Sequence, residues 1–484
     1  MQKTLLNLAA ATAVLCGAAT AQATRAIAFT NARIHPVSGA TIERGTLVIK
    51  NGKIEAVGKE VAVPAGARVI DATGKTIMPG LVSAWSSAGL RPQGRRTSRM
   101  PQRGGHRGRF SRTRSSSGGT ANKAATKVVD SLYARQAIFG DLLEVGVTTL
   151  ALNPAGNGFP GLGAVLNPAG KTLAALTVDD DAFVQIGMQR SAAAKKLLKD
   201  TFAKAKKVVE EREKPPAPPK KEEAKKPEPK KAEEKKPSSG EKKQEGKEPP
   251  KPKPTPEPKP EPKPKPEPKP EPKPEQQQGP EKGAAKKSAA KPKPKDPNLE
   301  VLADLLQGKR RAIVRIGSAA DLLHWCTAVA DDVEFPRAVV VPRHDTRAGT
   351  IDLVLERVKK WNCAVLLPPS LSELPNTAHL VNPAKKLHDT GVEVGFLVGD
   401  STGSVRNLFF QLMELVRGGL PADVALKGVT LVPAKALGVD KRKGSLEAGK
   451  DADFLVFAGD PLSPTGRLEQ VWLHGSKVDK HPRD

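Results

Sequence analysis

The histidines of this 484-residue chain show no pair with metal-ligand spacing. His379 and His388, which share one predicted helix, are nine residues apart and therefore misaligned by about a quarter turn at roughly 3.6 residues per turn. His35 lies in a predicted strand region and His106 in an arginine-rich tract. We find no Ser-His-Asp, Walker or Rossmann signature either. Residue types and spacing alone therefore point to no single chemistry.

The sequence also leaves the pairing of the cysteines open. Cys16 lies in an N-terminal apolar run, and Cys326 and Cys363 lie far along the chain. The latter two could pair in an oxidising compartment, but sequence does not show that their geometry permits a disulfide. The simpler interpretation is two buried free thiols.

The N-terminus has the pattern of a signal peptide over residues 1–23. Lys3 provides the positive start, Leu5 to Ala18 is a short apolar run, and Ala21 and Ala23 offer small-residue cleavage sites. The run is too short to span a bilayer, and no later segment is long and apolar enough to do so. We expect an exported, periplasmic or extracellular protein without a membrane span.

The elements that would position a site begin with short strands at 26–29, 46–49, 53–57 and 68–70. Asn51-Gly52 between the second and third is a strong hairpin signal. A helix is predicted over 124–144, a buried strand over 147–152 and a second helix over 191–212. From residue 298 four buried strands (312–316, 338–341, 364–367, 394–398) alternate with helices at 319–330, 350–360, 377–389 and 405–418. Repeated β-α units predict a parallel sheet closed into a barrel, and short strands return at 453–458 and 468–473.

Two low-complexity tracts carry most of the formal net charge of +27. Residues 91–114 hold nine Arg and no acid, and residues 213–297 hold 25 Lys against 16 acidic residues, so each contributes +9. The Arg, Gly and Ser stretch 91–122 is predicted to be a disordered loop. In 213–297 the alternation of Pro with Lys or Glu predicts extended polyproline II. We interpret it as a tolerated insertion whose ends lie near each other, with a spacer or anion-binding arm as the alternative.

Two groups of segments near the ends of the chain form a recognisable pattern. Near the start they are residues 31–36, 47–54 and the run Gly74-Lys75-Thr76-Ile77-Met78-Pro79-Gly80-Leu81-Val82; near the end they are 433–438, 444–453, 459–462 and 471–475. Together these segments resemble the amidohydrolase superfamily, most closely its imidazolonepropionase-like members. The resemblance implies an α/β fold, a distorted TIM (β/α)8 barrel plus a small β-sandwich formed by the N- and C-terminal segments. The implied divisions are 1–23, signal peptide; 24–78, first part of the sandwich; 79–212, first part of the barrel; 213–297, insertion; 298–440, second part of the barrel; 441–484, second part of the sandwich.

The resemblance also implies a metal site that this sequence lacks. Family members follow Pro-Gly-Leu-Val with a carboxylate and a His-x-His pair, whose histidines face one way from a strand and grip one metal. Here Ser83 stands at the carboxylate, and Trp85 and Ser87 stand at the histidines. An indole cannot ligate zinc, and a neutral serine is a poor ligand.

At the later metal-ligand positions of the family, this sequence again offers few suitable side chains. Arg315 occupies the next histidine's position, where its fixed charge would repel a cation. His344 is a weak candidate for the following one, and an ordinary surface histidine is the simpler interpretation. Asp400 fits the family's last aspartate, which orients the attacking water, and a turn-forming or helix-capping role ahead of Val405 is the alternative. We expect no metal, or zinc or another divalent ion if the site functions after all.

Three functions remain open at this point. The first is a catalytically inactive barrel kept for binding or assembly, with a small-molecule ligand in the barrel mouth near Arg315 and Asp400. The second is a hydrolase of non-peptide carbon–nitrogen bonds with an atypical mononuclear or metal-free site. The third is a polyanion- or envelope-binding protein that acts through residues 91–114 and 213–297. The sequence does not indicate an oligomeric state.

Overall fold

The computed structural model describes residues 25–90, 121–214, 295–329, 333–342, 351, 353–374 and 377–479. Most of both low-complexity tracts, the N-terminal 24 residues, His106 and His344 lie outside these described residues. All described residues belong to one compact unit. Within the described part, no helix is long and apolar enough to cross a membrane.

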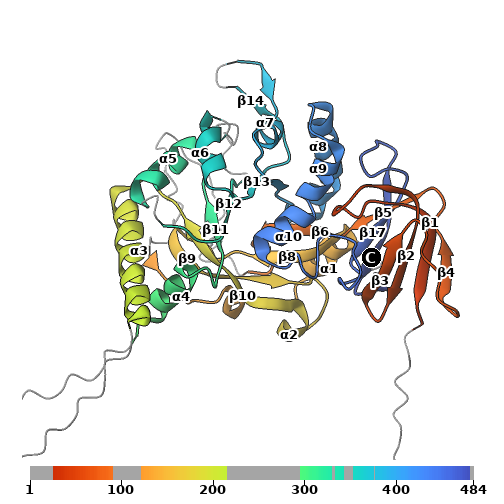
Figure 1. Ribbon diagram of the computed structural model, residues 1–484, viewed down its shortest axis with the longest axis horizontal. Coiled ribbons are helices and arrows are strands. Elements are labelled where there is room, and N and C mark those ends of the chain that lie inside the picture. Colours follow the sequence, from red (N-terminus) through yellow and green to blue (C-terminus); the bar gives the residue numbers. More distant parts are fainter. Residues whose placement is uncertain are drawn as a thin grey trace, which may run out of the picture. The chain divides into compact units, whose positions relative to one another are not determined.

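The first sheet joins the two ends of the chain (Figure 1). Its strand order is β19-β18-β17-β5-β1-β2-β3, with β4 beside β1. The N-terminal strands are β1 (Ile27–Ile34), β2 (Ile42–Lys50), β3 (Lys53–Gly58), β4 (Arg68–Asp71) and β5 (Lys75–Pro79); the C-terminal ones are β17 (Phe454–Ala458), β18 (Arg467–Leu473) and β19 (Ser476–Lys477). The predicted hairpin is confirmed, because Asn51 and Gly52 both have positive φ, as a type I′ turn requires.

The sandwich expected from the family takes the form of one curled sheet in the described residues. Phe29 on β1 contacts Trp472 on β18 with ring centroids 5.2 Å apart, although β5 and β17 lie between their strands. Strands three positions apart in a flat sheet would be about 14 Å apart, at roughly 4.8 Å per strand. The sheet therefore folds over an aromatic core that also holds Phe454.

The second sheet is the barrel-like part, in the order β16-β13-β12-β11-β10-β9-β8-β6 with β7 (Ala121–Asn122) beside β9. Its strands are β6 (Leu81–Ser86), β8 (Val147–Leu152), β9 (Gly158–Leu166), β10 (Thr177–Gly187), β11 (Ala312–Arg315), β12 (Arg337–Val340), β13 (Val365–Leu367) and β16 (Val394–Phe396). All neighbours in this order pair in parallel except β9, which is antiparallel to β8 and β10 but parallel to the short β7. This curled sheet fits the distorted TIM-like barrel that the sequence analysis expects. The expectation of a closed, parallel sheet is wrong in detail, because the sheet is mixed and its end strands β6 and β16 are not paired with each other.

The gap between these end strands is bridged from the chain after β16. The Val82 amide donates to the Val429 carbonyl at 3.0 Å, and the Ser83 hydroxyl donates to the Val398 carbonyl at 3.1 Å. Helix α10 (Leu431–Leu437) packs against both β6 and β16. The curled sheet is thus held closed by polar contacts and a helix instead of an eighth set of ladder bonds.

Helices cover the outer face of this sheet. They are α1 (Ala137–Glu144), α3 (Ala192–Glu213), α4 (Pro297–Leu306), α5 (Ala319–Ala328), α6 (Leu355–Lys360), α7 (Pro383–Asp389), α8 (Thr402–Arg417) and α9 (Ala422–Gly428), with the short α2 (Leu173–Leu176), the 3-10 helix η1 (Val128–Ser131) and the small hairpin β14 (Ser372–Glu373)–β15 (Leu380–Val381) between them. Side chains such as Val314 and Phe396 point to these helices, whereas Ile313 and Leu366 belong to a separate cluster with α10 on the other face. The inner face is therefore apolar and filled.

Candidate functional site

Polar side chains gather where the parallel strands of the barrel-like sheet end. Carboxyl ends of parallel strands meet at one edge, which is where active sites of barrel folds are built. Ser87 follows β6, Asn153 follows β8, Arg315 ends β11 and Asp400 follows β16. The prediction that Arg315 and Asp400 share this edge fits the strand register.

Asp400 links the two end strands of the sheet. Its Oδ2 accepts hydrogen bonds from the Ser87 amide at 2.9 Å and from the Ser87 hydroxyl at 3.2 Å. The residue that caps α8 is Ser401, whose hydroxyl accepts from the Ser404 amide at 3.2 Å. The alternative that Asp400 itself caps this helix is therefore wrong. None of the described residues forms a hydrogen bond with its buried Oδ1.

Arg315 is already engaged at the end of β11. Its guanidinium donates to the Asn157 side-chain oxygen, and Asn157 is a buried residue of the β8–β9 loop. Since side chains alternate along a strand, Arg315 shares the inner face with Ile313. The residue that the sequence analysis aligns with a family histidine is thus a guanidinium oriented by the Asn157 side-chain amide.

Asn153 and Gln185 also lie at this edge, and neither was predicted from the sequence. The Asn153 side chain accepts from the Ser86 amide at 3.1 Å and donates to the Gln185 Oε1 at 3.0 Å, and both Asn153 and Gln185 are buried. Asn153 could have been found because it directly follows an apolar strand. Gln185 had no such signal, because it lies within β10 between Val184 and Ile186.

Trp85 packs its ring against the apolar inner cluster and is only partly exposed. An indole offers a single N–H donor and no lone pair for a metal. Ser83, at the carboxylate position, is fully buried and donates to Val398. Trp85 and Ser83 on β6, and Ser87 just after it, are therefore used for packing and for closing the sheet.

The described residues at this edge do not fit a divalent metal ion. Asp400 is the one carboxylate among them, and one of its oxygens is already hydrogen-bonded. Two other acidic groups have suitable mutual spacing, Asp451–Asp453–His474 and Asp179–Asp180–Asp181. Both are paired with cations: Lys443 lies 2.5 Å from Asp453, and Lys127 lies 2.6 Å from Asp180.

The remaining candidates are scattered over the described residues. Neither Cys326 nor Cys363 forms a disulfide. The helix predicted over 377–389 is α7, which begins only at Pro383, so His388 lies in it whereas His379 precedes β15. His35 accepts or donates through Nδ1 to Thr41 at 2.9 Å, and burial lowers the pKa of its imidazole.

Comparison with known proteins agrees with this architecture. The model of the Amidohydrolase family matches residues 318–478. The chain is 29% identical over 197 residues to "Amidohydrolase tasK" of Hapsidospora irregularis, covering 38% of this chain and 19% of that protein. It is 32% identical over 139 residues to an imidazolonepropionase of Treponema denticola, covering 26% and 32% of the two chains. The chain thus matches between about a fifth and a third of these relatives' lengths.

Among solved structures, an amidohydrolase from Thermotoga maritima MSB8 superposes with a TM-score of 0.62 at 21% identity. The match covers 94% of this chain and all of the other. At this identity the likeness concerns the fold.

Proposed function

Because the chain belongs to the amidohydrolase superfamily, we propose that its barrel has given up metal-dependent hydrolysis and serves to bind a small polar molecule. In the family a bound metal lowers the pKa of water and supplies hydroxide near neutral pH. The replacement of the histidine pair by Trp85 and Ser87 removes that chemistry from the first strand. The single observation that carries the proposal is the hydrogen bonding of Asp400 to Ser87, because it ties the last carboxylate to a former ligand position.

The ligand's chemistry follows from the two charged groups at the edge. Arg315 favours an anionic or carbonyl oxygen, since its planar fork of N–H groups can donate two parallel hydrogen bonds. Asp400 keeps a buried acceptor, Oδ1, for an N–H or O–H of the ligand. A small molecule with an amide or a carboxylate beside an N–H group satisfies both requirements.

The proposal is tested by metal content and turnover on the same untagged, signal-free protein. After dialysis against metal-free buffer, mass spectrometry should find far less than one transition-metal ion per chain. Imidazolonepropionate, the compound that the relatives' name implies, should not be hydrolysed faster than in buffer, with and without added zinc. One or more tightly held ions per chain, or turnover that rises with zinc, would overturn the proposal.

A second candidate, hydrolysis without the full metal set, is favoured by one feature of Asp400. A buried carboxylate oxygen without a partner among the described residues is suited to accept a proton from water. Turnover that vanishes in Asp400→Asn but persists in metal-free buffer would support this alternative.

A further inference from the structure

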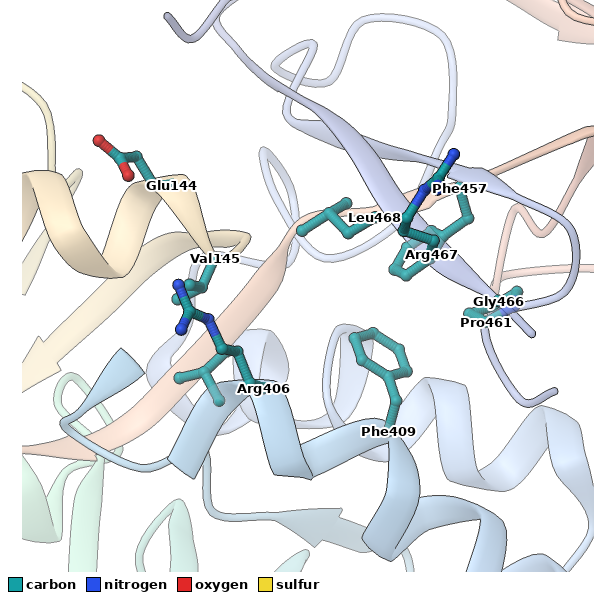
Figure 2. A pocket seen from close by; sticks show the side chains of 10 residues that line it. Glu144, Val145, Arg406, Phe409, Phe457, Pro461, Gly466, Arg467 and Leu468 are labelled. Atoms are coloured by element: carbon teal, nitrogen blue, oxygen red, sulfur yellow. The ribbon is translucent and has the colours of Figure 1, made fainter. Parts of the chain in front are cut away.

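A cavity of about 480 Å³ lies between α8 and the first sheet (Figure 2), and none of the polar residues named at the strand ends lines it. One wall is α8, with Val405, Arg406 and Phe409; the other is formed by Phe457 of β17 and Leu468 of β18. Binding sites for small molecules have volumes of about 300–1,000 Å³. The cavity is thus large enough for a compact ligand.

The interior surface of the cavity is apolar. Phe409 and Phe457 meet edge to face with centroids 5.1 Å apart, and Val145 and Leu468 extend the surface on either side. Phe457 is buried, whereas Phe409 and Leu468 are partly exposed. An apolar ring or chain in the cavity would cover the exposed parts of these side chains. The removal of this apolar surface from water would make binding more favourable.

The charges at the cavity rim are mainly positive. Arg406 on α8 and Arg467 on β18 lie on its two sides (Figure 2), and both are exposed. Arg467 contacts Glu469 at 3.3 Å, whereas Arg406 has no ion pair or hydrogen bond to another described residue. Glu144 also lies at the rim, but it already has an interaction of its own. Arg406 is therefore the group with the most unused capacity for an anion.

The walls are held in place before any ligand arrives. In the loop that forms one end, the Ser463 amide donates to the Asp460 carbonyl at 3.0 Å and the Gly466 amide donates to the Ser463 carbonyl at 2.9 Å. A Cβ at Gly466 would stand 2.0 Å from the Asp460 carbonyl oxygen, so only glycine allows this turn. Preorganised walls reduce the entropy lost on binding.

We propose that this cavity binds a small amphipathic anion, with its carboxylate at Arg406 and its apolar part over Phe409 and Phe457. A carboxylate is recognised because an Arg–carboxylate hydrogen bond is charge-assisted and geometrically specific. The site is separate from Arg315 and Asp400, and it does not depend on whether the barrel catalyses a reaction.

Isothermal titration with 4-phenylbutyrate and its neutral amide, at low ionic strength, tests the proposal. The acid should bind saturably and about tenfold more tightly than the amide, which corresponds to about 1.4 kcal/mol. Arg406→Gln should remove that preference for the acid, and Phe409→Ala should weaken both ligands. Arg417→Gln, at the end of the same helix but outside the cavity, is the matched control and should bind like the unchanged protein.

Two results would overturn the proposal. One is the absence of saturable phenylbutyrate binding; the other is unchanged binding in Arg406→Gln while thermal unfolding shows the variant to be folded. Arg315→Gln separates this cavity from the strand edge, because binding lost there would place the acid at the barrel instead. Glu144→Gln should keep or raise the affinity, since it removes a negative charge from the rim.

Discussion

Trp85 and Ser87 decide whether the chemistry of the family could be restored by simple reversion. Trp85→His combined with Ser87→His would supply two imidazoles, but Arg315 would still place a positive charge at the next ligand position. We expect the double variant to bind less than one zinc ion per chain after dialysis and to leave imidazolonepropionate intact. Turnover with added zinc would show that the rest of the site is preserved.

Cys363 should make the stability of the fold depend on pH in the alkaline range. Burial, opposed in part by Arg337, raises the pKa of its thiol from 9.0 to about 11. The folded protein therefore keeps a proton that the unfolded chain releases, so this stabilisation is complete below pH 9 and is lost as the pH rises from about 9 to about 11. Urea unfolding over this range should show a decrease in stability that is smaller in Cys363→Ala, by on the order of 2 kcal/mol. Parallel curves for the two proteins would contradict the assignment.

The site was predictable from sequence only where a family position fixed the residue. Asp400 and Arg315 were found in this way, and the structure gives each a specific partner. Gln185 was not, because an amide between two buried aliphatic residues gives no periodic or compositional signal. Its partner Asn153 comes from a strand about thirty residues earlier, and only the sheet brings them together.

At the scale of elements, the segment that joins α10 to β17 depends on a buried charge. The Lys443 side chain is 1% exposed, and its ammonium lies 2.5 Å from Asp453 and 3.4 Å from Asp451. Lys443→Met keeps the volume but leaves two buried carboxylates with one cation fewer, so we expect a loss of about 3–5 kcal/mol in urea unfolding. Lys441→Ala, two residues away and exposed, should change stability by less than about 0.5 kcal/mol. Similar losses in both variants would mean that the buried pair contributes little.

The strands predicted from residue 298 onward are confirmed, and so is the buried strand predicted over 147–152, which is β8. The other elements between 121 and 187 were not predicted correctly. A helix expected over 124–144 is replaced by η1 and α1, because Val128 and Val129 are buried in the irregular segment beside β9. The hairpin of β9 and β10 was missed since its first strand is rich in glycine. A Cβ at Gly163 would lie 2.0 Å from the Phe183 ring, so the packing of the partner strand requires that glycine. Such a requirement appears only once the two strands are paired.

At the scale of the whole molecule, the two parts of the barrel-like region that flank residues 215–294 in the sequence contact each other through α3 and α4. Arg212 near the end of α3 pairs with Glu300 and, at 2.8 Å, with Asp304 of α4. Helices α3 and α4 pack side by side (Figure 1). The chain therefore leaves and re-enters the folded part at neighbouring points, as the interpretation of a tolerated insertion requires.

Replacing residues 217–292 with a linker of about ten Gly and Ser residues should leave the fold intact. Shortening the connection by about three halvings reduces the entropy cost of closing it by about 2 kcal/mol, at roughly 0.6 kcal/mol per halving. We therefore expect urea unfolding to remain a single transition with equal or slightly higher stability. Arg212→Ala should lower the stability of the full and shortened proteins alike, because the α3–α4 contact is present in both. If the shortened protein lost cooperative unfolding while Arg212→Ala in the full chain did not, residues 217–292 would be contributing contacts to the fold.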